Sequence, residues 1–294
     1  MPGSMMQPDL SVVAGDTGVR ADALARWQDG GWPGPRVEAW RFTRVDQLAD
    51  RDLVRADALT GDAAGPGAAA AASMGAHVIR FENGVLDTGC LDGLPDGVTA
   101  REIATDETAL QRLAELAPNG HPVSDLSMAA MTGGIVIEVS GAVAAPLMLL
   151  FEGGHADCSA HPAILVSLAA GAHLQLAEWH QSGVGLSAPL IGVDVGPEAR
   201  LEQVKVQSEG ADTTHLAATG VALAEKSSIS GFSLSTGGAL ARLETHVALL
   251  GKGADCQLSA IYMGRGAQHQ DITTFMDHAV AECTSNQICL LYTS

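Results

Sequence analysis

The chain has 294 residues, of which 47% are hydrophobic and only 4% aromatic, and its formal net charge is −18 at pH 7. This length allows two or three domains and a sizeable core, and the shortage of aromatic residues favours a thin core of small and aliphatic side chains. The negative charge argues against a nucleic acid or an anionic membrane surface as partner, because both would repel it.

Residues 1–60 predict an N-terminal helical region. Arg20–Trp27 and Arg44–Leu48 combine good helix formers with apolar residues near helical spacing. Gly30–Pro35 lies between them and is expected to be a loop, because its three glycines and two prolines cannot sustain a helix. Residues 61–76 are rich in alanine and glycine and predict a mobile linker.

Residues 77–131 predict a small α/β section. An Asn-Gly turn at Asn83 lies between two short apolar runs, which is typical of a β-hairpin. Thr105–Leu116 and Ser124–Met131 predict two short helices, the first with Thr105 or Asp106 placed to cap it.

Residues 132–287 show a regular repeat. Short apolar runs of β-type alternation end at steps of 29, 27, 28 and 27 residues, and their last residues are Val139, Leu168, Val195, Leu223 and Leu250. After a turn, each repeat continues with a second apolar run, as in Leu174–Leu176, Val204–Val206, Phe232–Leu234 and Leu258–Ile261. Two strands per fixed period indicate a β-solenoid, in which each coil buries its inner face by stacking on its neighbours. The predicted fold class is therefore mainly β, a β-solenoid that follows an N-terminal helical region.

One loop has nearly the spacing of a metal site. His155, Asp157, Cys158 and His161 fall within seven residues, in a stretch that reads as the turn between two solenoid strands. A structural metal site needs four converging ligands, and one short loop rarely supplies all of them. We therefore predict a solvated loop here and no metal site.

The densest polar cluster lies near the end of the repeat. It consists of Gln268–Asp271 and the later Asp277-His278 pair. Alternation along a strand places His269 and Asp271 on one face and the two glutamines on the other. No nucleophile stands beside them, so a hydrogen-bonded His–Asp pair is favoured over a catalytic or metal-binding role. His269, Asp271 and His278 are the candidate site residues, as structural or interface groups.

No motif of a nucleotide-dependent or hydrolytic enzyme is present. The sequence contains no P-loop and no Gly-x-Ser-x-Gly elbow, and the Gly133-Gly134 pair predicts a turn. Five scattered cysteines without Cys-x-x-Cys spacing indicate reduced thiols. Since no secretory signal and no apolar run of membrane-spanning length is visible, we expect a cytoplasmic protein. The sequence shows no active site and no evident intrinsic cofactor.

Two segments resemble the SufB/SufD family of iron–sulfur cluster assembly proteins. Val37–Thr43 contains a Glu-x-Trp-Arg-Phe-Thr sequence similar to one near the start of the SufD branch. Gly264–His278, followed by Cys283–Gln287, resembles the Gln-His-x-Asp group, later histidine and polar turn that both branches share. The resemblance spans most of residues 37–287, and its first segment favours the SufD branch.

The resemblance implies a right-handed parallel β-helix flanked by helical domains. It also implies a non-enzymatic scaffold subunit that pairs with a SufB-like paralogue and binds a SufC-like ATPase, so that nascent clusters are built and transferred. A transient iron–sulfur cluster at the interface with the partner would be its only cofactor. Residues 288–294 do not match the family, so we expect a non-matching tail and a chain that is C-terminally truncated relative to it.

Two alternatives stay open at this point. A β-helix carbohydrate-active enzyme would need acidic and basic side chains stacked on successive coils. Only Asp194, Lys205 and Arg242 approach this pattern, and they occupy non-equivalent positions in the repeat. A metal-binding solenoid rests on the presence of ten histidines alone. Co-purification with SufB- and SufC-type partners would favour the scaffold over both.

Overall fold

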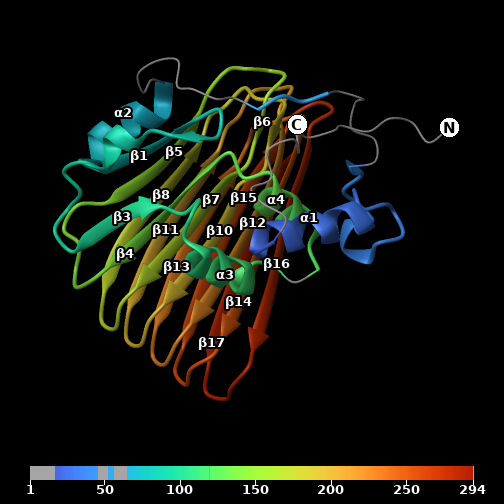
Figure 1. Cartoon of the computed structure of the whole chain (residues 1–294). Coiled ribbons are helices and arrows are strands. Elements are labelled where there is room, and N and C mark those ends of the chain that lie inside the picture. The colour runs from blue at the N-terminus through green and yellow to red at the C-terminus, as the bar shows by residue number, and fades with distance from the viewer. Residues whose placement is uncertain (1–16, 46–51, 56–64, 119, 294) are drawn as a thin grey trace.

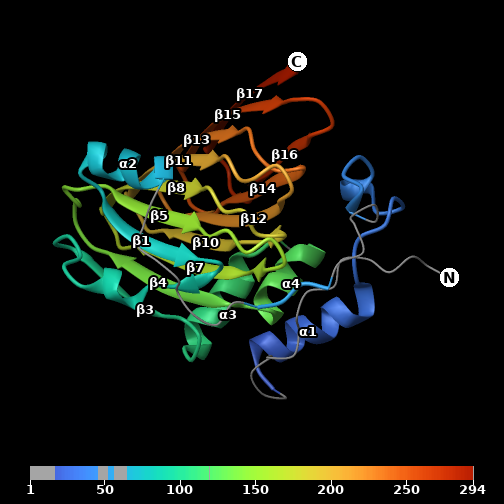
Figure 2. The same ribbon diagram turned by 90° about the horizontal axis from the view of Figure 1, so that it is seen from above.

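Two β-sheets face one another along the length of a solenoid, and successive strands alternate between them (Figures 1 and 2). The computed structural model describes residues 17–45, 52–55, 65–118 and 120–293. The strands of the first sheet, in spatial order, are β2 (Val85–Leu86), β1 (His77–Glu82), β5 (Leu147–Glu152), β8 (His173–His180), β11 (Arg200–Gln207), β13 (Ser228–Ser235), β15 (Asp255–Gly264) and β17 (Thr284–Thr293).

The second sheet begins with an antiparallel pair and continues with parallel strands. Its strands are β3 (Val98–Glu102), β4 (Gly133–Val139), β7 (Pro162–Leu168), β10 (Leu190–Val195), β12 (Thr214–Leu223), β14 (Leu240–Leu249) and β16 (His269–His278). The short strand β9 (Leu186–Ser187) also pairs with β12, and the short strand β6 (Ser159–Ala160) pairs with β9. Pairs β1–β2 and β3–β4 are antiparallel, and the pairs between coils are parallel. The protein is therefore a parallel β-helix, as the sequence predicts.

The predicted period coincides with the register of the second sheet. Strands β4, β7, β10 and β12 end at the predicted residues, and their last residues lie side by side in neighbouring strands. Strand β14 ends at Leu249, one residue before the predicted Leu250, whose side chain is half exposed in the turn. The repeat in the sequence thus reflects one strand end per coil.

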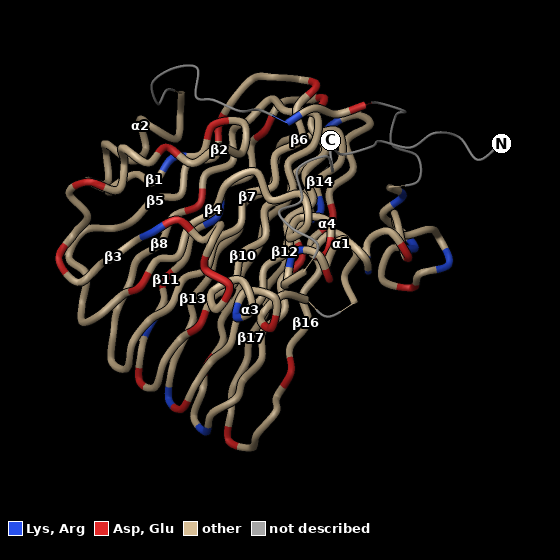
Figure 3. Tube along the Cα trace, in the orientation of Figure 1, with Lys and Arg blue, Asp and Glu red and all other residues tan. Residues whose placement is uncertain are grey.

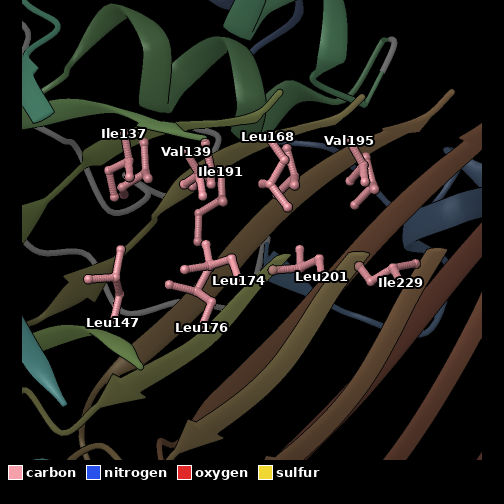
Figure 4. Close-up of a cluster of buried hydrophobic side chains, with 14 of the residues drawn as sticks. Ile137, Val139, Leu147, Leu168, Leu174, Leu176, Ile191, Val195, Leu201 and Ile229 are labelled. Carbon is pink, nitrogen blue, oxygen red and sulfur yellow. The ribbon is translucent and has the colours of Figure 1, made fainter. Parts of the chain in front are cut away.

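The core is a stack of aliphatic side chains between the two sheets (Figure 4). Leu174, Leu201 and Ile229 lie in register on successive strands of the first sheet and face Leu168 and Val195 of the second. Each buried side chain of this size contributes about 1.5–3 kcal/mol relative to its exposed state. Stacking between coils therefore stabilises the solenoid at every repeat.

The second apolar run of each repeat is less regular than the first. Leu174 and Leu176 point inward, but Val204 and Phe232 lie on the outer face of the first sheet and are 46% and 37% exposed. The inward position of those two coils belongs to Leu201 and Ile229. Spacing alone locates these strands, but it does not tell which side of the sheet each residue faces.

One left-handed residue recurs in each of the last five turns from the second sheet to the first. These residues are Gly171, Glu198, Lys226, Gly253 and Glu282, with φ values of 68°, 59°, 54°, 74° and 66°. The turns also form a ladder, because the backbone N–H of each of the first four donates to a carbonyl of the next turn at 2.8–3.0 Å. Figure 3 shows that acidic and basic residues gather at these turns, while the strands between them are mostly uncharged.

We expect Lys226→Gly to raise the free energy of unfolding by about 0.5–1 kcal/mol, because glycine adopts a left-handed backbone without the steric cost that lysine incurs. The ion pairs of Lys226 with Glu198 and Glu225 are exposed, so their loss is expected to cost little. Urea denaturation measures the change. Lys252→Gly is the matched control, since Lys252 is an exposed turn lysine outside the left-handed region, and it should give no gain. A stability of Lys226→Gly equal to or below the wild type would contradict the prediction.

Helices cover the outer face of the second sheet. They are α1 (Val19–Gly30), α3 (Glu107–Leu116) and α4 (Pro122–Ala129), which pack over β7, β10 and β12 (Figure 2). All three were predicted, and the Asp106 side chain caps α3 by accepting from the backbone N–H of Ala109 at 3.0 Å.

The short helices η1 (Glu38–Trp40) and η3 (Thr88–Leu91) are also present. Most of the predicted helix Arg44–Leu48 lies outside the described residues. Among the helices that are described, none combines the length and the hydropathy needed to cross a membrane.

Two predicted boundaries differ from the structure. The expected linker 61–76 contains helix α2 (Gly65–Met74), since alanine is the strongest helix former and Ala71 packs on Met148 and Leu150 of β5. The expected tail 288–294 continues strand β17 to Thr293, in register with β15. Its residues include Ile288 and Tyr292, which favour the extended conformation.

Candidate functional site

The two segments that resemble the SufB/SufD family contact each other in the structure. The Thr43 hydroxyl donates to Asp271 Oδ2, and Thr43 Oγ1 lies 3.4 Å from His269 Nε2. Thr43 is buried and ends the first segment, whereas His269 and Asp271 belong to the second, more than 220 residues later. The β-helix therefore brings both segments to one place on the outer face of β16.

Arg242 is the centre of this polar cluster. Its guanidinium is buried on the outer face of β14 and donates through Nη1 to Asp271 Oδ2 at 2.5 Å. Nη2 and Nε donate to Glu244 Oε2 at 2.6 and 3.0 Å. The Trp40 ring lies against the same group, with 4.3 Å between Arg242 Cζ and the ring centre. Charge-assisted hydrogen bonds and a cation–π contact thus hold Arg242 from three sides.

Glu244 joins this cluster to helix α4. Its carboxylate accepts from His246 Nε2 at 2.8 Å and from His121 Nε2 at 3.0 Å. His121 Nδ1 accepts from the backbone N–H of Ser124 as the N-cap of α4, so Nε2 carries the imidazole proton. Burial raises the pKa of the Glu244 carboxyl, but the two histidines and Arg242 outweigh it and hold this pKa well below its usual range. We call Thr43, His121, Arg242, Glu244 and Asp271 the outer cluster.

The structure brings together two of the three candidate site residues. His269 and Asp271 share the outer face of β16, as alternation predicts, and Gln270 points inward, where its amide donates to the Gly237 carbonyl at 2.7 Å. His278 lies at the far end of the same strand and pairs with Ser285 Oγ at 3.0 Å. His278 therefore belongs to a separate contact between β16 and β17.

The loop between β5 and β7 is only partly solvated, which corrects the prediction. His155 and Asp157 are exposed, but Cys158 and His161 are buried, with His161 Nε2 against the hydroxyl of Ser159. Cys158 packs with Ala160 and Val184 between neighbouring coils, which draws the second half of the loop inward. Within the described residues this loop does not form a grouping of metal-ligand atoms.

A second polar cluster lies inside the solenoid, beyond the aliphatic core. Glu178 of β8 and Lys205 of β11 point inward on neighbouring strands, with 3.1 Å between Lys205 Nζ and Glu178 Oε2. Lys205 Nζ also donates to Thr219 Oγ1 of the opposite sheet at 3.2 Å. Burial raises the pKa of the Glu178 carboxyl, but Lys205 and His180 outweigh this effect and lower it to about 2. The ion pair is therefore formed at neutral pH.

Two histidines and a glutamate lie next to this ion pair. Glu209 Oε2 is 2.7 Å from His215 Nδ1, and the rings of His180 and His215 meet edge to face at 4.9 Å. The ring of Phe151 stacks on His180 at 4.3 Å. All three polar side chains are buried, and we call Glu178, His180, Lys205, Glu209 and His215 the inner cluster.

The inner cluster is not among the predicted sites, although the sequence contains a signal of it. Every second residue of β8 faces inward, and these residues are Leu174, Leu176, Glu178 and His180. Alternation thus places the two polar residues on the same inner face as the leucines. The same argument applies to Leu201 and Lys205 of β11. Polar residues at inward positions of a core strand are a sign of a buried site.

The three residues considered for a carbohydrate-active enzyme do not converge. Asp194 accepts from Arg112 of α3 at 2.8 and 2.9 Å on the outer face of the second sheet. Lys205 points into the solenoid and Arg242 into the outer cluster. These side chains therefore do not form one substrate-binding surface.

Comparison with known proteins agrees with this architecture. Residues 151–290 match the family described as SUF system FeS cluster assembly, SufBD core domain. The chain is 29% identical over 104 residues to an iron–sulfur cluster assembly SufBD family protein of Mycobacterium leprae, which covers 35% of this chain and 26% of that protein. A protein of the same description from Mycobacterium bovis is 29% identical over 107 residues, covering 36% of this chain and 27% of the relative.

The matched residues include most of the coils of the β-helix and both strands that carry the outer cluster. The matches with the mycobacterial relatives cover little more than a quarter of each relative's length. The resemblance noted in the sequence is confirmed at the level of the family. Residues 151–290 therefore form the core domain of a SufB/SufD family protein of the SUF system of iron–sulfur cluster assembly.

Proposed function

We propose that this protein is a SufD-type scaffold subunit of iron–sulfur cluster assembly. In this role the protein is not an enzyme. It pairs with a SufB-like subunit and binds a SufC-like ATPase, and ATP hydrolysis is the work of that ATPase. The nascent cluster is cargo, held transiently at the interface between the paired subunits and passed on to other proteins. The proposal places the chain in the cytoplasm, in keeping with its scattered free cysteines.

The observation that carries the proposal is the match of residues 151–290 to the SufBD core domain on a parallel β-helix. The segment Val37–Thr43 favours the SufD branch, and its Trp40 and Thr43 are buried against Arg242 and Asp271 of the core domain. This segment is therefore an integral part of the fold, which supports its use as a marker of the branch.

Co-expression tests the proposal. The chain, with an affinity tag, is produced together with a SufB-type and a SufC-type protein, and the purified material is analysed by native mass spectrometry. We expect one assembly that contains all three chains. Recovery of the tagged chain without either partner, under conditions in which the SufB- and SufC-type proteins are themselves folded, would overturn the proposal.

His269→Ala is expected to weaken pairing with the SufB-like partner about tenfold, since truncating a central interface residue costs more than about 1 kcal/mol and about 1.4 kcal/mol corresponds to a tenfold change. His269 is half-buried on β16, and its present contact is Thr43. Affinity is measured by titrating the labelled partner. His155→Ala, in an exposed loop on another coil, is the control and should bind like the wild type. Unchanged affinity of His269→Ala would leave His269 and Asp271 with a structural role only.

A further inference from the structure

The inner cluster contains imidazole nitrogens that lack a hydrogen-bond partner. His180 Nδ1 and His215 Nε2 are fully buried and make no hydrogen bond, and His215 Nδ1 lies 2.7 Å from Glu209 Oε2. A buried polar group without a partner costs about 1–3 kcal/mol, so such groups in a native fold call for an explanation. One nitrogen of each ring lies close to the Glu209 carboxylate inside the solenoid, which suggests a shared ligand.

The arrangement of these atoms suits a metal ion. One nitrogen each of His180 and His215 and one carboxylate oxygen of Glu209 lie within 4.8 Å of one another. This is the single grouping of three or more histidine, cysteine or acidic ligand atoms in the described part of the chain. Metal–nitrogen and metal–oxygen bonds of about 2.0–2.2 Å place ligand atoms at most about 4.4 Å apart, so a bound ion would draw these atoms slightly closer together. Two imidazoles and one carboxylate form a ligand set used for Fe2+ and Zn2+.

The groups around the ligands orient them. Glu178 Oε2 accepts from His180 Nε2 at 3.3 Å, so the proton resides on Nε2 and the lone pair of Nδ1 is free to bind a cation. Glu209 in turn accepts from the Ser182 hydroxyl at 2.8 Å and from the Gln207 amide at 3.1 Å. Hydrogen bonds of this kind fix the tautomer and position of metal ligands.

Charge balance points the same way. Lys205 neutralises Glu178, whereas the neighbours of Glu209 are the neutral Ser182 and Gln207 side chains and the ring of His215. Among the described residues, no lysine or arginine pairs with Glu209. A buried carboxylate without a cation is costly, and a divalent metal ion would compensate it.

We propose that His180, Glu209 and His215 bind one divalent first-row transition-metal ion, of the Fe2+ and Zn2+ class, inside the β-helix. The ion reaches the site through local opening of the loops after β8 and β11. These loops contain no strand, and Gly183 of the first loop packs against Gly210 of the second, so side chains do not lock the loops together at this point. The site uses residues of this chain alone, so it does not depend on the proposed partners.

Metal titration of the full chain tests the proposal. The chain is purified without a metal-chelating tag, freed of metal, and titrated with Co2+, whose visible absorption reports the number and type of ligands. We expect one Co2+ per chain with an absorption of imidazole and carboxylate ligation, displaced by one equivalent of Zn2+. Wild-type protein that is folded by circular dichroism and binds no Co2+ would overturn the proposal.

Variants locate the site. His180→Gln, His215→Gln and Glu209→Gln each keep the approximate shape of the side chain and should weaken Co2+ binding by tenfold or more. His161→Gln is the control, because His161 is an equally buried histidine outside the ligand group. Should a single variant fail to fold, X-ray absorption of the zinc-loaded wild type still reports whether two imidazoles are bound. Full binding by the folded double variant His180→Gln/His215→Gln, or equal loss in His161→Gln, would place the ion elsewhere and overturn the assignment.

Discussion

Replacing Arg242 by alanine is expected to lower the free energy of unfolding by about 3–5 kcal/mol, the usual cost of removing one partner from a buried ion pair. The substitution leaves the carboxylates of Glu244 and Asp271 facing each other without their shared cation. It also removes the group that packs on the Trp40 ring. Guanidinium chloride denaturation gives the change in stability.

Arg112→Ala is the matched control for this prediction. Arg112 pairs with Asp194 and Glu115, but these side chains are more than a third exposed, so solvent screens the pairs. Exposed pairs contribute about 0–1 kcal/mol, and the control should lie in that range. A loss below 1 kcal/mol in Arg242→Ala would contradict a structural role of the outer cluster.

Arg242→Ala should also loosen the N-terminal segment. The Thr43 hydroxyl holds the segment on the β-helix by its hydrogen bond to Asp271, and Arg242 positions Asp271 by a second hydrogen bond. Limited proteolysis should therefore cut near residues 41–44 faster in this variant than in Arg112→Ala. The same experiment separates local release of the segment from loss of the whole fold, because the core coils stay protected in the first case.

The β-helix could be predicted from sequence because its repeat is local and regular. Each coil ends an apolar strand at the same position, so four strand ends fall at the predicted residues and the fifth differs by one. A turn follows each strand end, and its left-handed residue recurs at nearly the same interval, from Gly171 to Glu282. Such signals repeat several times, and an error in one coil is corrected by the others.

The two polar clusters could not be assembled in the same way. The contact between Thr43 and Asp271 joins a segment outside the repeat to a late coil, and no periodicity relates their positions. For the inner cluster, alternation orients Glu178 and His180, but Glu209 lies in the loop after β11 and His215 on β12 beyond it. The path of that loop decides whether their side chains meet, and spacing does not determine it. The helix α2 was missed for another reason, since a run of alanines reads as low complexity until it has a surface to pack on.

Lys205→Met is expected to cost about 3–5 kcal/mol at neutral pH, because it leaves the Glu178 carboxylate buried without its cation. Methionine has nearly the volume of the lysine stem, so the loss would reflect charge rather than a cavity. The double variant Lys205→Met/Glu178→Gln removes both charges and should recover most of the lost stability. If the double variant is as unstable as Lys205→Met, packing and not charge determines the effect.

The pH dependence of stability separates these explanations further. In the wild type the folded pKa of Glu178 is about 2, below its ordinary value of 4.5, so the pair stabilises the fold above pH 4.5 and this contribution is lost as the pH falls toward 2. Without Lys205, burial dominates and raises the folded pKa above the unfolded one, so protonation favours the folded state. The stability deficit of Lys205→Met relative to the wild type should therefore shrink as the pH is lowered from 7 toward 4.5, as measured by denaturation at each pH. A deficit that stays constant over this range would show that an ionised Glu178 is not the cause of the lost stability. A shrinking deficit would show that Lys205 stabilises the fold by neutralising the buried Glu178 carboxylate.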